Sequence, residues 1–198
     1  MNFVPIQVFS HYSIGRALPA PEQIVDRCKE LGYTSCALTD HNSISGAIEW
    51  HKACKEAGIK PIIGIKLDLC DQHPSIKDKT NPSTSHITLL AKNLRGWKSL
   101  IRITSEANAN YYQGPRLSLD CLKEYQEDLL AIVADKELTE KANKIFSALF
   151  TVYNAALPES YYCKKEDAID HRVVLCSYLK TTLKQVHSKL NSNLVKFF

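Results

Sequence analysis

The sequence lacks the features of a membrane or exported protein. No run of about 18 apolar residues occurs, although 44% of the residues are hydrophobic, so no membrane-spanning helix is expected. The opening MNFVPIQVFSHYS has no basic segment followed by a long apolar stretch, so no secretory leader is predicted. Both absences favour a globular, cytoplasmic protein.

Cysteine pairs at metal-binding spacing are also absent. The seven cysteines are scattered, odd in number and never arranged as Cys-x-x-Cys, so a zinc ribbon is not indicated. Unpaired thiols of this kind are typical of a reducing compartment, where most of them are buried as small apolar groups. The cysteines therefore indicate a cytosolic protein.

Glycine-rich phosphate-binding motifs are missing too. The chain has seven glycines and contains neither Gly-x-Gly-x-x-Gly nor a P-loop sequence. A nucleotide-binding doubly wound sheet therefore loses its strongest sequence support.

What is present is a modest, unevenly placed positive charge. The formal net charge is +4, and the segment 177–198 holds four lysines and no acidic residue: Lys180, Lys184, Lys189 and Lys196. Four apolar residues recur there at helical spacing: Leu179, Leu183, Val186 and Leu190. This basic amphipathic segment is open to two interpretations, a final helix packed on the body or a docking helix for nucleic acid or an acidic partner.

Strand and helix patterns alternate along the chain. Strands are expected over residues 3–9, 34–39, 61–69, 86–91 and 128–134, with a short one near 149–153. Helices are expected from Pro21 to Gly32, from a cap at Ser43 to Gly58, from after residue 91 to about 107, over 138–149 and over 165–180. Loops are expected over 71–85 and 108–116.

This alternation favours parallel strands joined by right-handed crossovers, and therefore an α/β fold of the β/α barrel type. In such a barrel, functional residues lie at the C-terminal ends of the strands. The residues expected there are Thr39, Asp40 and His41 after the second strand and Lys66 in the third. The whole of 1–198 is expected to form a single domain.

Several long segments resemble the PHP (polymerase and histidinol phosphatase) domain that opens the bacterial DNA polymerase III alpha subunit. They are ALTDH, KEAGIKPIIG, HITLLAKNLRGWKSLIRITSEA and YYCKKEDAIDHRVVLCSYLKTTL, in the order found in that family. The resemblance implies an irregular β/α barrel with seven strands and a metal cluster at the strand ends. The stretch 135–160 has room for one helix and one short strand, so the barrel is expected to be one β/α unit short of seven.

The resemblance also implies which positions should hold metal ligands, and five of them carry other residue types. The family's opening His-x-His falls on Gln7 and Phe9, its aspartate on Arg16, the glutamate after PIIG on Lys66, and the last residue of the closing Asp-x-His on Tyr161. Two positions keep their histidines, His41 and His86, and two others hold carboxylates, Asp135 and Glu159. His11, two positions after Phe9, is a further candidate on the same strand face.

The substituted positions argue against a metal cluster on electrostatic grounds. Two unit charges about 4 Å apart at an effective dielectric of about 20 interact by roughly 4 kcal/mol, and a divalent ion would double this. Arg16 and Lys66 would therefore repel the ions that carboxylates should neutralise, and Phe9 offers no lone pair. The metal site is expected to be degenerate, with no cofactor; zinc or manganese is the alternative.

The resemblance therefore predicts a catalytically inactive PHP domain, a pseudoenzyme that serves as scaffold and protein-docking module in DNA replication. Expected partners are a proofreading exonuclease subunit or a polymerase core. The chain is expected to be either part of a DNA-directed DNA polymerase or a stand-alone PHP-like protein that binds a replication partner. Weak DNA contact through the four lysines of 177–198 is a further expectation. The alternative is a residual metal-dependent phosphoesterase built from His11, His41, His86, Asp135 and Glu159.

Local structural roles compete with these assignments. The sequence favours a hydrogen-bonded pair of His41 with Asp40 that closes the loop into the helix at Ser43, and a structural role for His86, over metal binding by either histidine. The loop YYQGPR offers Tyr111, Tyr112, Gln113 and Arg116 for stacking on nucleic acid, or simply packs its aromatic rings.

Overall fold

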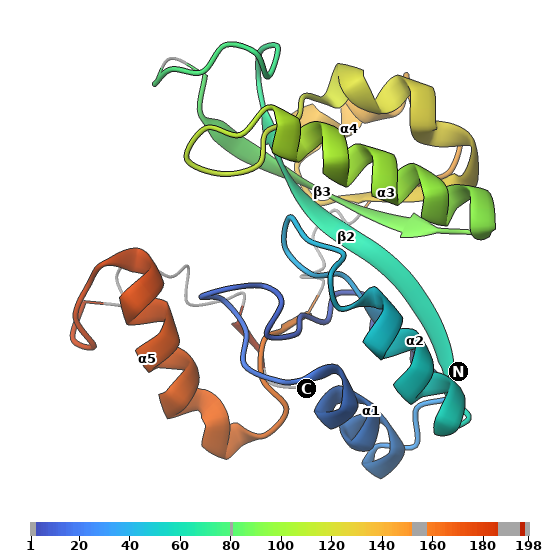
Figure 1. Cartoon of the computed structure of the whole chain (residues 1–198), viewed down its shortest axis with the longest axis vertical. Helices are drawn as coiled ribbons and strands as arrows, with labels where there is room; N and C mark the ends of the chain where they lie inside the picture. Colours follow the sequence, from blue (N-terminus) through green and yellow to red (C-terminus); the bar gives the residue numbers. More distant parts are fainter. Residues whose placement is uncertain (1–2, 80, 152–157, 186–194, 197–198) are drawn as a thin grey trace. The chain divides into compact units, whose positions relative to one another are not determined.

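The computed structural model describes residues 3–79, 81–151, 158–185 and 195–196 of the 198-residue chain (Figure 1). Within these residues, no helix combines the length and apolar character that a membrane span requires. The chain divides into two compact units. The first comprises residues 1–40, 45–62 and 158–198, and the second comprises residues 41–44 and 63–157.

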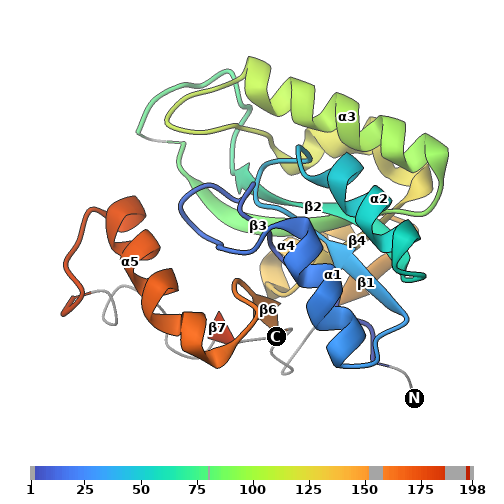
Figure 2. The same cartoon turned by 60° about the horizontal axis from the view of Figure 1, so that its bottom comes forward.

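The first unit contains two helices that lie side by side, α1 (Pro21–Glu30) and α2 (Ala47–Glu56), as Figures 1 and 2 show. Pro21 occupies the first turn of α1, and Gly32 follows that helix with a φ of 70°, a left-handed conformation that glycine adopts without strain. The unit also contains β1 (Ser35–Leu38), β6 (Glu159–Ser160), β7 (Val195–Lys196), a 3-10 turn η2 (Lys165–Asp167) and α5 (Ala168–Leu179).

The strand expected over residues 3–9 is wrong as a regular strand. The segment forms one isolated bridge, Val8 to Ser160, together with single backbone bonds such as Ala37 N–H to the Pro5 carbonyl at 2.9 Å. Pro5 has no N–H to donate, so a continuous ladder cannot form through it. The segment is therefore held by separate bonds to β1 and β6.

The expected start of α2 at Ser43 is also wrong, because the helix begins at Ala47 with Gly46 as its cap residue. A Cβ atom at Gly46 would lie 2.7 Å from the Tyr12 ring and 3.1 Å from the Asp40 carboxylate. This close approach requires glycine, and it sets the helix entry three residues later than Ser43.

The second unit is a sheet covered by helices. It contains most of β2 (Lys60–Cys70), then β3 (Ser83–Ala91), α3 (Leu94–Ala109), the 3-10 segment η1 (Leu119–Asp128), β4 (Leu129–Val133), α4 (Lys136–Ala142) and β5 (Leu149–Thr151). Its core joins one face of the strands to α3, η1 and α4 through fully buried side chains such as Leu67, Leu89 and Leu100.

The five strands follow the order β1-β2-β3-β4-β5, and the sheet is mixed. β2 pairs with β3 and β3 pairs with β4 in antiparallel fashion, whereas β4 and β5 are parallel. The expected all-parallel arrangement is therefore wrong. The described residues between β2 and β3 form a polar loop without a crossover helix, and antiparallel neighbours can be joined in this way.

The expected helix over the basic C-terminal segment is contradicted in its described part. α5 ends at Leu179, Lys180 adopts a left-handed conformation with a φ of 48°, and residues 181–185 are not helical. Val186, Lys189 and Leu190 lie outside the described residues. Lys180 and Lys184 are exposed, and the side chain of Lys196 is not described.

Candidate metal centre

The β2–β3 hairpin carries a polar face opposite the core. In its register Asp68 pairs with His86 and Lys66 pairs with Thr88, while Leu67 pairs with Ile87 between them. Because directly opposite residues share a face and successive residues alternate, the polar pairs lie together and the apolar pair points into the core. Asp68, His86, Lys66 and Thr88 therefore share one face of the second unit.

His41 joins this face from a different part of the chain. Residue 41 forms an isolated parallel bridge with Lys66, and the next N–H, that of Asn42, donates to the Lys66 carbonyl at 2.7 Å. The Nε2 of His41 lies 2.9 Å from Asp68 Oδ1, and Nδ1 of His86 lies 2.6 Å from the same oxygen. The three potential ligand atoms all lie within 4.8 Å of one another.

Asn42 fixes the carboxylate that the two histidines share. Its side-chain N–H donates to Asp68 Oδ2 at 2.9 Å, and its side-chain oxygen accepts from the Asp68 backbone N–H at 2.9 Å. Asn42 has a φ of 53°, a left-handed conformation that asparagine tolerates better than most residues. The residue that follows His41 therefore orients the Asp68 carboxylate toward the two histidines.

The electrostatics of the group favour an ionised carboxylate. Burial opposes ionisation of Asp68, but hydrogen bonds and positive charge from His41 and His86 outweigh it and hold the pKa of this carboxyl well below its usual range. The His41 side chain is only 5% exposed, whereas that of His86 is 49% exposed. The group thus has one open side, at His86.

The donor set suits a single divalent ion. Two imidazoles and one carboxylate are ligands that zinc and manganese accept. Within the described ranges, His41, Asp68 and His86 form the one group of three such side chains that converge. Lys66, a buried cation, occupies the same strand face two residues from Asp68. The arrangement has the donors for one ion and lacks the larger donor set of a cluster.

The predicted ligand positions of the first unit are occupied by packed side chains. The Phe9 ring stacks on that of Tyr161, with centroids 4.6 Å apart and an interplanar angle of 12°. The Tyr161 hydroxyl donates to Glu159 at 2.6 Å. The Arg16 guanidinium carbon lies 4.8 Å from the centroid of the Tyr178 ring, and Arg16 Nη2 donates to the Tyr178 hydroxyl at 2.6 Å. Gln7 is buried in the same unit.

The structure changes the assignments of His11 and of the expected His41–Asp40 pair. His11 is exposed and lies against the Tyr12 ring, with centroids 4.4 Å apart. The pairing of His41 with Asp40 is wrong, because the Asp40 carboxylate accepts from the hydroxyls of Ser10 and Ser13, each at 2.7 Å. Burial raises the pKa of Asp40, and these hydrogen bonds partly oppose the rise. His41 instead lies against Asp68.

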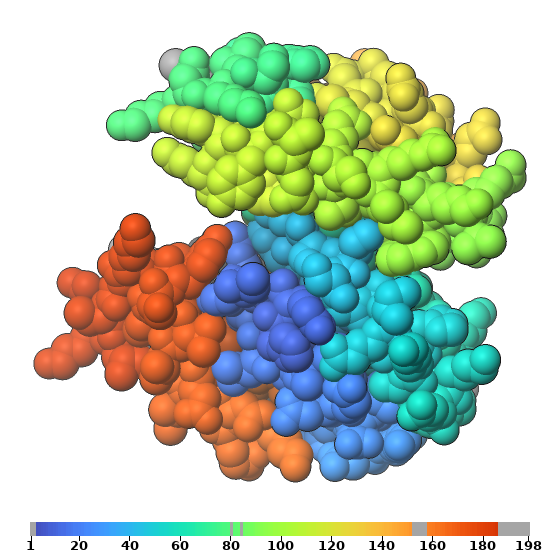
Figure 3. Space-filling view, viewed as in Figure 1, coloured from blue at the N-terminus to red at the C-terminus, as the bar shows by residue number. Residues whose placement is uncertain are grey.

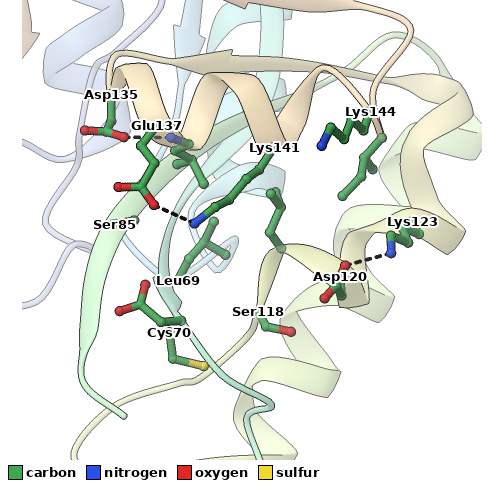
Figure 4. A pocket seen from close by; sticks show the side chains of 14 residues that line it. Leu69, Cys70, Ser85, Ser118, Asp120, Lys123, Asp135, Glu137, Lys141 and Lys144 are labelled. Carbon is green, nitrogen blue, oxygen red and sulfur yellow. Dashed lines mark hydrogen bonds and ion pairs between the residues drawn. The ribbon is translucent and has the colours of Figure 1, made fainter. Parts of the chain in front are cut away.

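Asp135 is a helix cap that borders a separate cavity. Its carboxylate accepts from the Leu138 N–H at 2.7 Å at the start of α4. The cavity has a volume of about 570 Å³ and lies in the second unit (Figure 4). In that view Lys141 reaches Glu137 at 2.8 Å and Lys123 reaches Asp120 at 2.7 Å. Asp135 belongs to this cavity lining rather than to the converging group.

Asp68 and Asn42 were missed by the sequence reasoning. The period-2 pattern of 61–69 places Lys66 and Asp68 on one face, which was a usable signal. The missing step was the antiparallel pairing that brings His86 directly opposite Asp68, because the strands were expected to be parallel.

Comparison with known proteins gives a family match over most of the chain. The family model described as "PHP domain" matches residues 6–176. Among curated proteins, the DNA polymerase III subunit alpha of Chlamydia pneumoniae is 33% identical over 135 residues, and that of Borreliella burgdorferi is 36% identical over 136 residues. Each alignment covers 67% of this chain, which spans only 11% and 12% of those relatives, respectively.

Solved structures show more distant likeness. An amidohydrolase from Chromobacterium violaceum is 14% identical, with a TM-score of 0.48 over 91% of this chain and 84% of that one. A structure described as a metal-dependent phosphoesterase from Bifidobacterium adolescentis is 12% identical, with a TM-score of 0.44 over 93% of this chain and 54% of that one.

Proposed function

The chain belongs to the PHP domain family, and from this premise we propose that it is a catalytically inactive PHP domain of a DNA polymerase III alpha-like protein. Its role is that of a scaffold and protein-docking module in DNA replication, in the cytoplasm. The curated relatives, which are DNA polymerase III alpha subunits, support the assignment to replication.

The main support for catalytic inactivity is the packing of side chains at the positions where the family resemblance places metal ligands. Phe9 is fully buried and stacks on Tyr161. Two positions where the family resemblance places metal ligands therefore form an aromatic contact in this chain. Arg16, at a third such position, is engaged with Tyr178. These side chains stabilise the fold of the first unit and supply no donors for a metal cluster.

The proposed architecture is a PHP-type β/α barrel that is one β/α unit short of seven, formed by residues 1–198 as one domain. The mixed five-stranded sheet and the family match over 6–176 support a fold of this type. If the chain is part of a longer protein, the parent activity is that of a DNA-directed DNA polymerase.

Binding to replication proteins tests this role. We expect the purified chain to bind a proofreading exonuclease subunit or a polymerase core at micromolar concentration in surface plasmon resonance. Absence of binding to both would refute the docking role. A DNA duplex serves as a third analyte, because contact through Lys180, Lys184, Lys189 and Lys196 should weaken steeply as salt is raised.

A second candidate function is a residual metal-dependent phosphoesterase, favoured by the convergence of His41, Asp68 and His86. This set replaces the broader one, since Asp135 caps α4 and Glu159 accepts from Tyr161. A bound zinc or manganese ion would supply an activated water there. His41 and His86 would hold it together with Asp68.

Metal content separates the two candidates. The chain is exposed to zinc and to manganese, freed of excess metal and measured by elemental mass spectrometry. The inactive domain predicts near-zero stoichiometry. One ion per chain, lost in His86→Ala and kept in the control His51→Ala on the exposed surface of α2, would favour the phosphoesterase. Hydrolysis of a generic phosphoester that depends on the ion and on His41 would then complete that case.

A further inference from the structure

Arg116 is a buried cation of the second unit. The residue is 3% exposed, and its backbone N–H donates to the Ala107 carbonyl at 2.9 Å. One side-chain nitrogen, Nη2, donates to the Asn81 carbonyl, whereas Nε is buried without a hydrogen-bond partner. No carboxylate of the described residues forms an ion pair with it. A guanidinium carries five N–H donors, and the one on Nε is buried here without an acceptor.

Such a group is costly to bury, and this points to a ligand. Uncompensated buried charge is strongly unfavourable, and the exceptions among buried polar groups often mark a missing ion or partner. The cost is lowered by the Tyr112 ring, whose centroid lies 5.6 Å from the Arg116 guanidinium carbon. The ring supplies no hydrogen-bond acceptor at Nε.

Arg116 lines a surface cavity of the second unit. The cavity has a volume of about 350 Å³, and its lining includes Asp68, Asp78, Lys79, Tyr112 and Gln113 beside Arg116. It lies between the loop that precedes β3 and the loop that follows α3. Figures 1 and 3 show these green and yellow-green segments next to each other at the surface. The size is that of a small-molecule or side-chain site.

The charge of the lining selects the kind of anion. Lys79 and Arg116 are balanced by Asp68 and Asp78. Asp68 Oδ1 already lies within ion-pair distance of His41 and His86, and Oδ2 accepts from Asn42. A doubly charged phosphate would meet both carboxylates. A planar, singly charged carboxylate matches the guanidinium fork and adds the least repulsion.

The surroundings favour a peptide as the carrier of that carboxylate. Tyr111, next to the cavity residue Tyr112, is 58% exposed. Tyrosine and arginine are the residue types that dominate protein–protein binding energy, when a buried anchor is surrounded by near-neutral contacts. A free small acid would make no use of the exposed ring.

We propose that the Arg116 cavity binds the side-chain carboxylate of an acidic peptide segment in a partner protein. The proposal rests on the docking function above and supplies its anchor point. It also replaces the stacking of nucleic acid that the YYQGPR loop suggested, because two carboxylates, those of Asp68 and Asp78, line the same cavity and would repel a phosphate.

The test is a titration of the ¹⁵N-labelled chain followed at the Arg116 Nε–H resonance. The probes are acetyl-Gly-Ser-Glu-Ser-Gly-amide, its Gln counterpart and inorganic phosphate, each up to about 20 mM, a range that saturates millimolar sites. We expect the Glu peptide alone to shift the resonance saturably. Equal shifts with the Gln peptide, no shift with either peptide, or a larger shift with phosphate would each overturn the proposal.

Variants locate the effect. Arg116→Lys identifies the resonance, and Arg116→Met should lower the affinity for a fluorescein-labelled Glu peptide at least about tenfold, measured by anisotropy. Arg102→Met, at an exposed arginine of α3, is the matched control and should leave the affinity unchanged. If Arg116→Met does not fold, Tyr112→Leu keeps the guanidinium and should weaken peptide binding several-fold. Unchanged affinity in the folded variants would contradict the assignment.

The two proposals fail separately. Partner binding that survives Arg116→Met would refute the cavity and leave the docking role intact. A selective response to the Glu peptide without binding of either replication protein would support the cavity and refute the proposed replication role.

Discussion

Single residues decide whether this chain keeps any metal chemistry. Asp68 Oδ1 lies 2.9 Å from His41 Nε2 and 2.6 Å from His86 Nδ1, while the other oxygen, Oδ2, accepts from Asn42. At the positions where the family resemblance places further ligands, Phe9 and Tyr161 stack on each other. The chain therefore combines one converging group of donors with a set of positions that serve packing.

Substitution of Asn42 tests the hydrogen bonds that hold Asp68 in place. Asn42→Ala should destabilise the protein by about 1–2 kcal/mol more than Asn42→Gly, because both lose the hydrogen bonds but only alanine strains the left-handed backbone. Urea unfolding followed by circular dichroism measures the difference. Equal stabilities of the two variants would show that the backbone relaxes out of this conformation.

Phe9 tests the packing role of a position where the family resemblance places a metal ligand. Phe9→Ala should lower the free energy of unfolding by about 3–5 kcal/mol, because it removes a fully buried ring and its stack on Tyr161. Phe3→Ala, at a ring that is 55% exposed, is the control and should cost much less. Similar losses in both variants, again measured in urea, would argue against a structural role for Phe9.

At the scale of elements, the polar residues that precede α3 and α4 have structural roles as helix caps. Asn93 caps α3 by accepting from the N–H groups of Arg95 and Gly96, and Asp135 caps α4 by accepting from that of Leu138. Gly96 lies where any Cβ would collide with the Asp128 carbonyl, so the packing of α3 against the end of η1 requires glycine. Asp135 therefore has a complete structural explanation.

The cap assignment of Asp135 is testable. Asp135→Ala should cost about 1 kcal/mol of stability, and Asp135→Asn or Asp135→Ser should restore most of it, since their oxygens also accept from the helix N–H groups. Thermal or urea unfolding gives the ranking. If asparagine and serine fail to rescue while metal content falls, Asp135 is a ligand and the cap is secondary.

At the scale of the whole molecule, buried thiols should make stability fall at alkaline pH. Burial raises the pKa of Cys54 to about 12 and that of Cys163 to about 11. An unfolded thiol ionises near pH 9, so the unfolded state loses its proton first as the pH rises. The penalty is absent below pH 9 and grows between the unfolded and folded pKa values.

The size of this effect follows from proton linkage. For Cys54 the loss should approach about 1.4 kcal/mol per pH unit above pH 9. Unfolding in urea at a series of pH values should therefore show a flatter alkaline decline for Cys54→Ala than for the native chain. Cys121→Ala, at a partly exposed thiol, is the control and should keep the native decline. Identical slopes in all three proteins would show that Cys54 ionises in the folded state.

The sequence by itself determined the elements with strong local signals. Pro21 and Gly32 bound α1, the alternating apolar residues of β2 face the core, and the family motifs identify the PHP domain. These features depend on near neighbours along the chain, through proline and glycine geometry and through side-chain periodicity.

Only the tertiary structure decided the direction of strand pairing and the composition of the sites. Strand pattern is the same for parallel and antiparallel partners, so the sequence could not show that His86 lies opposite Asp68. Likewise, nothing local to YYQGPR shows that Arg116 is buried against Asn81 without an anion. Burial and hydrogen-bond partners are set by residues distant in the chain, and these determine which charged groups are satisfied within the fold.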